Sequence, residues 1–170
     1  MPKPLLAIAL ATVCFLLVEI ALQVRSHVRF GQSVLSRVQA GPSNVRDPRT
    51  GMGLLPPNQT SGGSLQVIRS NSFGLRSPEI ALDKPEGTVR IAVLGASTVY
   101  GAYAPNNEST FPGRLERLLR ERFPALKIEV INGGIPGFGL TEQAQLFQRL
   151  VADFKPDITI VYPGFNDFGV

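Results

Sequence analysis

In the second half of the chain, short apolar runs alternate with longer amphipathic stretches. Three short runs rich in β-branched residues occupy positions 89–94, 128–131 and 158–162. Each run stops at a turn of small or polar residues. Apolar runs this short, bounded by turns, are typical of strands buried in a parallel sheet.

Two amphipathic stretches connect these runs and predict helices. The first has Thr110 as a candidate N-cap and Pro112 in its first turn, and Pro124 ends it. The second begins with Thr141 as its candidate cap and stops before Pro156. Strand–helix–strand–helix–strand order with short connections predicts right-handed crossovers and a three-layer α/β fold around a parallel sheet.

The amino terminus has a different pattern. Residues 5–24 are almost wholly apolar, with Lys3 before them and basic residues after them. About 20 such residues are needed to cross a ~30 Å hydrocarbon layer. A signal peptide is the alternative, but no small-x-small cleavage site follows Ile20, and Cys14 follows a poor lipoprotein box. We therefore expect an uncleaved transmembrane anchor over residues 1–25, in which Glu19 lies near the membrane boundary.

The region between the anchor and the first strand, residues 26–88, reads as a stalk, linker and lead-in. Residues 28–38 are weakly amphipathic and predict a continuation of the anchor helix. Glycine, proline, serine and asparagine then dominate residues 41–63. A short edge strand is expected at 65–68, and the segment 71–79 (Asn-Ser-Phe-Gly-Leu-Arg-Ser-Pro-Glu) turns the chain toward the α/β part, residues 89–170.

Composition narrows the classes of function. The 170 residues are 44% hydrophobic and carry a net charge of +4. Residues 1–50 hold six basic and two acidic residues, which leaves eleven of each in residues 51–170. Residues 51–170 are therefore neutral, and no basic face for nucleic acid is expected. The single cysteine permits no intramolecular disulfide.

The sequence also lacks the usual signatures of cofactor sites. It has no cluster of Cys, His and carboxylate residues with metal-ligand spacing, and no phosphate-cradling Gly-x-x-x-x-Gly-Lys. We expect neither a metal nor a cofactor. A nucleotide-binding domain is disfavoured because residues 133–137 lack Gly-x-Gly-x-x-Gly spacing and no acidic residue closes the second strand.

The turns after the three strands carry the candidate chemistry. They read Gly95-Ala96-Ser97-Thr98, Gly133-Gly134-Ile135-Pro136-Gly137 and Gly164-Phe165-Asn166-Asp167. The carboxyl ends of parallel strands share one edge of a sheet, so a serine hydroxyl, a glycine N–H and an asparagine amide should meet there. Acyl transfer requires a nucleophile beside donors aimed at a developing oxyanion.

These three blocks, in this order, resemble the SGNH (GDSL-like) hydrolase family. The resemblance covers roughly residues 45–170, and the anchor with the 71–79 segment is similar to membrane-anchored bacterial members. It implies Ser97 as the nucleophile, with Gly137 and Asn166 in the oxyanion hole. The implied function is a serine esterase acting on O-acyl esters, including O-acetyl carbohydrate or lipid esters, through a Ser97 acyl-enzyme, and the implied location is periplasmic or extracellular. The implied partners are a small-molecule or glycan ester and the membrane.

The loop residues also have simpler structural interpretations. Gly137 could only relieve a tight turn, Asn166 could only form a turn or cap a helix, and Asp167 reads as a local turn or capping group. The basic residues that follow the anchor favour a cytoplasmic domain instead.

Two departures from the family pattern affect the expected activity. Ala96 stands where the family usually has aspartate, and no Asp-x-x-His block supplies a base. The only histidine, His27, abuts the anchor and reads as an interfacial residue. In a flavodoxin-like 2-1-3 order the third strand would also be an unpaired apolar edge. The sequence therefore predicts an incomplete or degenerate copy that is inactive as it stands, with a non-catalytic glycan-binding module as the alternative.

Overall fold

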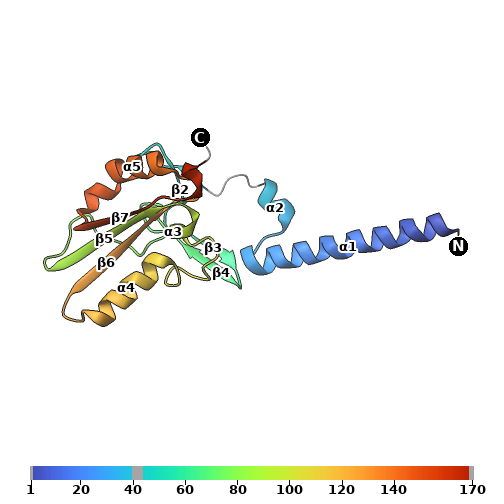
Figure 1. Ribbon diagram of the computed structural model, residues 1–170, viewed down its shortest axis with the longest axis horizontal. Helices are drawn as coiled ribbons and strands as arrows, with labels where there is room; N and C mark the ends of the chain where they lie inside the picture. Colours follow the sequence, from blue (N-terminus) through green and yellow to red (C-terminus); the bar gives the residue numbers. More distant parts are fainter. Residues whose placement is uncertain (1, 40–43, 169–170) are drawn as a thin grey trace. The chain divides into compact units, whose positions relative to one another are not determined.

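A computed structural model describes residues 2–39 and 44–168 of the protein (Figure 1). The described chain divides into two compact units. The first holds residues 2–39 and 61–66, and the second holds residues 44–60 and 67–168.

The first unit consists mainly of one long helix, α1 (Lys3–Phe30), drawn in blue in Figure 1. It ends because Gly31 adopts the left-handed conformation, with φ of 71°, and donates its N–H to the His27 carbonyl at 2.8 Å. A separate short helix, α2 (Val34–Gln39), follows. The expected continuous stalk helix through Val38 is therefore wrong, and Gly31 is the physical reason. Most of β3 (Thr60–Gly63) also belongs to this unit.

The second unit is built on a three-stranded parallel sheet with the order β6-β5-β7. β5 (Thr88–Gly95) is central, and it pairs with β6 (Lys127–Gly134) and β7 (Ile158–Tyr162). The predicted α/β class, parallel sheet and 2-1-3 order are confirmed. β6 runs three residues beyond its predicted end because residues 132–134 continue the ladder against the last three residues of β5.

The helices α4 (Phe111–Arg122) and α5 (Leu140–Arg149) cover opposite faces of this sheet (Figure 1). Thr110 is the N-cap of α4, as predicted, and its hydroxyl accepts the Gly113 N–H at 3.2 Å. Thr141 is not the cap of α5. That helix starts at Leu140, and its N-cap is Gly139, two residues before the predicted cap.

A distinct core lies on each face of the sheet. The face under α4 buries residues of β5, β6 and α3 (Ser97–Tyr100): Ile91, Val93, Val99, Ile128 and Val130. The other face packs the central strands against α5 and the 3₁₀ helix η1 (Val151–Phe154), burying Ala92, Leu94, Ile131, Leu146, Leu150, Val151 and Phe154. The second amphipathic stretch thus buries its apolar side chains, as an amphipathic helix should, although η1 replaces its last α-helical turn.

The segment before the sheet contributes more to this core than a linker would. It forms a small antiparallel pair, β1 (Val45–Arg46) with β2 (Gly53–Leu54), and then β4 (Gln66–Arg69), close to the strand expected at 65–68. Four of its apolar side chains join the α5-side core: Met52, Leu54, Leu75 and Ile80. The interpretation of residues 26–88 as stalk, linker and lead-in therefore misses their contribution to the core.

β7 lies at the edge of the sheet, as the topology predicts. Among the described residues only β5 pairs with it. Ile158, Val161 and Tyr162 stay about half exposed, and Phe165 and Phe168 beyond them are almost fully exposed. The edge therefore presents an apolar surface and a row of unpaired backbone groups.

Candidate active site

Ser97 follows the central strand directly and opens the one-turn helix α3. Ala96 before it and Val99 after it are buried, whereas Ser97 is exposed. The Ser97 carbonyl accepts the N–H groups of Gly101 and Ala102 at 3.0 and 3.1 Å. No residue that the structure describes forms a hydrogen bond with the Ser97 hydroxyl, which is therefore accessible for chemistry.

The second loop lies against the first. The Ile135 N–H, just after β6, donates to the Gly95 carbonyl at 3.0 Å. Gly134 allows this approach, because a Cβ at that position would lie 2.1 Å from the Tyr100 nitrogen of α3. The end of β6 therefore lies directly beside the serine-bearing turn.

Gly137 occupies a tight turn at the exposed edge of that loop. The Phe138 N–H donates to the Ile135 carbonyl at 3.2 Å, with Pro136 and Gly137 between them. The Gly137 φ of 87° fits the third position of a type II turn, which glycine favours. Its N–H has no partner within the described part of the chain. Gly137 therefore both forms the turn and leaves its N–H available as a hydrogen-bond donor.

Asn166 reaches the second loop from the third. It lies in η2 (Phe165–Asp167), and its Nδ2 donates to the Phe138 carbonyl at 3.0 Å. A side-chain amide has a second N–H for another acceptor. The structure therefore brings Asn166 next to the turn that contains Gly137.

Asp167 serves as a local cap. Its carboxylate accepts the Leu140 N–H at 2.5 Å and the Gly164 N–H at 3.0 Å. It supplies the acceptor that the start of α5 needs, and its interpretation as a capping group is confirmed.

The three loops leave the sheet at one level, since Gly95 pairs with both Gly134 and Tyr162. No family model matches the chain, and no curated protein matches it. Among solved structures, the chain is similar to AlinE4, described as an SGNH-hydrolase family esterase, and to a serine-to-alanine mutant of the same esterase.

Both of these matches are esterases. The identities are 26% and 25%, the TM-score is 0.41 in each case, and each alignment covers 49% of this chain. It covers 44% of the esterase, so this chain spans less than half the length of the solved structures that it matches.

One site neighbour was missed in the sequence. Gln143 of α5 is fully buried, and its Nε2 reaches the same Phe138 carbonyl at 3.5 Å. Two amides therefore converge on one carbonyl of the second loop. A polar residue on the buried face of an amphipathic helix is the signal that could have indicated this role.

The sequence's one histidine, His27, lies in α1, in the other unit. No group of three His, Cys, Asp or Glu side chains that could hold a metal occurs among the residues described. The neighbouring Tyr100 is buried at the end of α3, and this burial raises the pKa of its phenol. The base for Ser97 is therefore unassigned.

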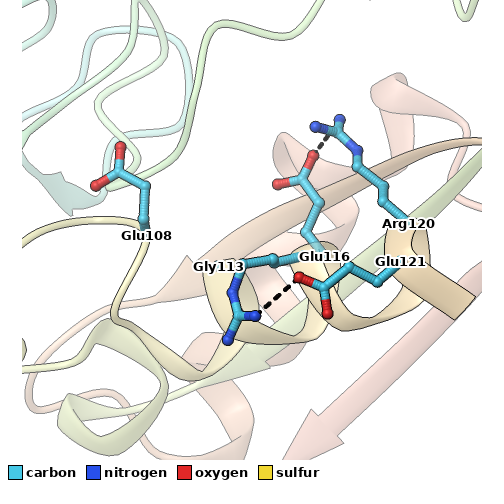
Figure 2. Close-up of a pocket in the computed structure, with 6 residues that line it drawn as sticks. Glu108, Gly113, Glu116, Arg120 and Glu121 are labelled. Atoms are coloured by element: carbon cyan, nitrogen blue, oxygen red, sulfur yellow. Dashed lines mark hydrogen bonds and ion pairs between the residues drawn. The ribbon is translucent and has the colours of Figure 1, made fainter.

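An open hollow of about 420 Å³ lies away from these loops. It lies on α4, between Glu108 and charged residues of the helix (Figure 2). Figure 2 shows the Glu116 and Glu121 carboxylates each meeting an arginine, in ion pairs with Arg120 and Arg117. These two pairs neutralise the helix charges, and Glu108 is the lining carboxylate that forms no ion pair with any described residue.

Proposed function

We propose that this protein is a serine esterase of the SGNH type, which cleaves O-acyl esters through an acyl-enzyme on Ser97. The observation that carries the proposal is the hydrogen-bonded joining of the three loops. Ile135 ties the second loop to the first, and Asn166 ties the third to the second. An exposed serine, an unpaired glycine N–H and a side-chain amide thus belong to one connected edge.

The chemistry follows from these groups. The Ser97 Oγ attacks the ester carbonyl and gives its proton to a base. The N–H groups of Ser97 and Gly137 and the Asn166 amide hold the negative oxygen of the tetrahedral intermediate. The alcohol leaves with a proton, and water then hydrolyses the acyl-serine. Loss of one oxyanion donor typically costs about 10²–10³ in rate.

We further propose that α1 holds the α/β unit at a membrane as a single-pass anchor, on the periplasmic or extracellular side. α1 has 28 residues, about 42 Å at 1.5 Å per residue, and its apolar side chains are exposed. It is long and apolar enough to cross a bilayer, whose core is about 30 Å thick. The sidedness comes from the family resemblance.

The absence of an assigned base supports a second candidate, a non-catalytic glycan-binding module. No described residue forms a hydrogen bond with the Ser97 hydroxyl, and an unactivated serine is a weak nucleophile. The two candidates differ in one property, which is whether Ser97 can be acylated once a base is supplied.

The test uses the full chain in detergent, treated with a fluorophosphonate or with p-nitrophenyl acetate, with and without added imidazole as an external base. We expect imidazole-dependent modification of the peptide that carries Ser97. Ser97→Ala should abolish it, and Asn166→Ala should slow it about 10²–10³-fold. Thr98→Ala is the matched control, because Thr98 is the neighbouring residue, carries a hydroxyl and is also exposed.

If imidazole gives the wild type no modification above the Ser97→Ala level, the esterase proposal fails. The binding-module interpretation would then stand, and a glycan array would be the next measurement.

A further inference from the structure

The 71–79 segment carries a buried cation that the proposed chemistry does not use. Arg76 is only 1% exposed, yet no carboxylate within the described ranges forms an ion pair with it. Its partners are neutral. The guanidinium donates to the carbonyls of Gly101, Ala104 and Tyr100 at 2.6, 3.2 and 3.3 Å, and to the Asn107 side chain at 3.1 Å.

These carbonyls lie immediately after the serine-bearing turn. The Gly101 and Ala102 N–H groups donate to the Ser97 carbonyl, while the carbonyls of Tyr100 and Gly101 accept from Arg76. One residue, Gly101, is thus bonded to Ser97 through its N–H and to Arg76 through its carbonyl. β5 holds Ser97 from one side, since Gly95 pairs with Gly134 and Tyr162, and Arg76 supports the other end of α3.

Arginine suits this task better than any other side chain. Its planar group offers five N–H donors in a fixed fork, so it can hold several carbonyls in one arrangement. Burial lowers the pKa of the Arg76 guanidinium, and the neighbouring Tyr100 and Glu108 oppose that shift. A buried cation without an ion pair is costly, and it persists only where its hydrogen bonds are well satisfied.

The rest of the segment holds Arg76 in place. Asn71 accepts the N–H groups of Phe73 and Leu75 on its Oδ1, both at 3.0 Å. Its Nδ2 donates to the Pro78 carbonyl at 3.2 Å. The segment is therefore closed on itself on both sides of Arg76, which makes Arg76 a fixed support for the loop after α3.

We propose that Arg76 is a positioning residue for Ser97, acting through the carbonyls of Tyr100 and Gly101. The inference rests on the proposed esterase function for its consequence in rate, since Arg76 does not touch the acyl group. Its structural part, that Arg76 fixes the turn holding Ser97, stands independently of that function.

The test compares Arg76→Lys with Arg90→Lys. Arg90 is the matched control, because it is also fully buried and holds a carbonyl, that of Phe154 at 2.6 Å, near the opposite end of β5. Fluorophosphonate labelling of Ser97 is measured in the full chain in detergent with imidazole. We expect Arg76→Lys to slow labelling roughly 10- to 100-fold, as for small displacements of reacting groups, and Arg90→Lys to leave the labelling rate of the folded protein unchanged.

Equal slowing by the two variants, after correction for the fraction folded, would overturn the inference, since it would reduce Arg76 to general stability. No slowing by Arg76→Lys would overturn it as well.

Hydrogen exchange tests the role of Arg76 separately from the esterase proposal. Arg76→Lys should speed exchange of the Gly101 and Ala102 amides while the β5 amides stay protected. Uniform acceleration, or none at residues 101–102, would overturn the inference even if wild-type Ser97 labels well. If wild-type Ser97 does not label, the esterase proposal fails, and the exchange measurement still decides the role of Arg76.

Discussion

Gly137 and Gly164 give a matched pair of residues at the candidate site. An added Cβ would meet nothing within 4 Å at either position. Their backbones differ, since Gly137 has a φ of 87° and Gly164 a φ of −146°. Only Gly137 therefore depends on glycine for its conformation.

This contrast predicts different costs for the same substitution. Gly137→Ala should lower the free energy of unfolding by about 1–2 kcal/mol, because an L-residue is strained in the left-handed region. Gly164→Ala should have no comparable effect. Urea titrations at a shared m-value measure both. Equal losses would show that space, and not backbone conformation, limits these positions.

At the scale of single residues, the sequence identified the candidate site residues but not their contacts. Ser97, Gly137 and Asn166 follow from strand ends and motif order, which are local signals. The partner of Asn166, the Phe138 carbonyl, lies 28 residues away in the chain. Arg76 and its carbonyl partners are 24 to 28 residues apart. Contacts of this range depend on packing, which no local pattern encodes.

At the scale of elements, the start of α4 is held by a single side chain. The Thr110 hydroxyl accepts the Gly113 N–H at 3.2 Å and donates to the Asn107 carbonyl at 2.6 Å. The same cap thus joins α4 to the loop that Asn107 and Arg76 organise.

Removal of this cap should destabilise the α/β unit. Thr110→Ala should lower the free energy of unfolding by about 0.5–2 kcal/mol, the usual range for an N-cap. Thr110→Ser keeps the hydroxyl and should retain most of the stability. Urea midpoints of the two variants decide the point, and identical losses would assign the effect to the lost methyl group.

Two of the element boundaries that were predicted wrongly have different causes. The start of α5 was misplaced because the Leu140 N–H is bonded by Asp167, which is 27 residues away in the chain. No local sequence rule anticipates such a cap. The end of α1 was readable, since Gly31 directly follows Phe30, and glycine there commonly ends a helix.

At the scale of the whole α/β unit, Asp157, just before β7, is bonded to the distant stretch of chain that contains Lys84 and Arg90. Its carboxylate accepts the Arg90 N–H at 2.7 Å and pairs with Lys84 at 2.5 Å. The hydrogen bond from the Arg90 backbone, followed by that from Lys84, lowers the pKa of Asp157 below its ordinary value. The folded state therefore favours the ionised carboxylate.

This shift predicts a pH-dependent contribution to stability. Because the folded pKa is the lower one, the unfolded chain binds more protons in the window between the two values. The contribution is complete above the unfolded value of about 3.9 and is lost as the pH falls through the folded pKa. Asp157→Asn should therefore lower the urea midpoint at pH 7, and its difference from the wild type should shrink toward pH 3.

The control is Asp83→Asn. Asp83 is fully exposed and lies 3.9 Å from Lys155. Exposed pairs of this kind contribute little, so its midpoint should match the wild type at both pH values. A loss for Asp157→Asn that is as large at pH 3 as at pH 7 would rule out ionisation as its cause.

The architecture of the sheet followed from the sequence because crossover rules leave few arrangements for a strand–helix repeat. The core role of Met52, Leu54, Leu75 and Ile80 did not. These residues lie in irregular chain with no period of 2 or 3.6, so nothing in their spacing marks them as buried.

The central place of β5 has a consequence for biosynthesis. Of the three strands of this sheet, β5 leaves the ribosome first, the two strands that flank it are made later, and β7 begins about 60 residues after β5 ends. At a translation rate of about 5–20 residues per second, both edges of β5 stay unpaired for several seconds. Translation speed through residues 96–157, and chaperones that bind extended apolar chain, should therefore influence how much of this protein reaches its folded state.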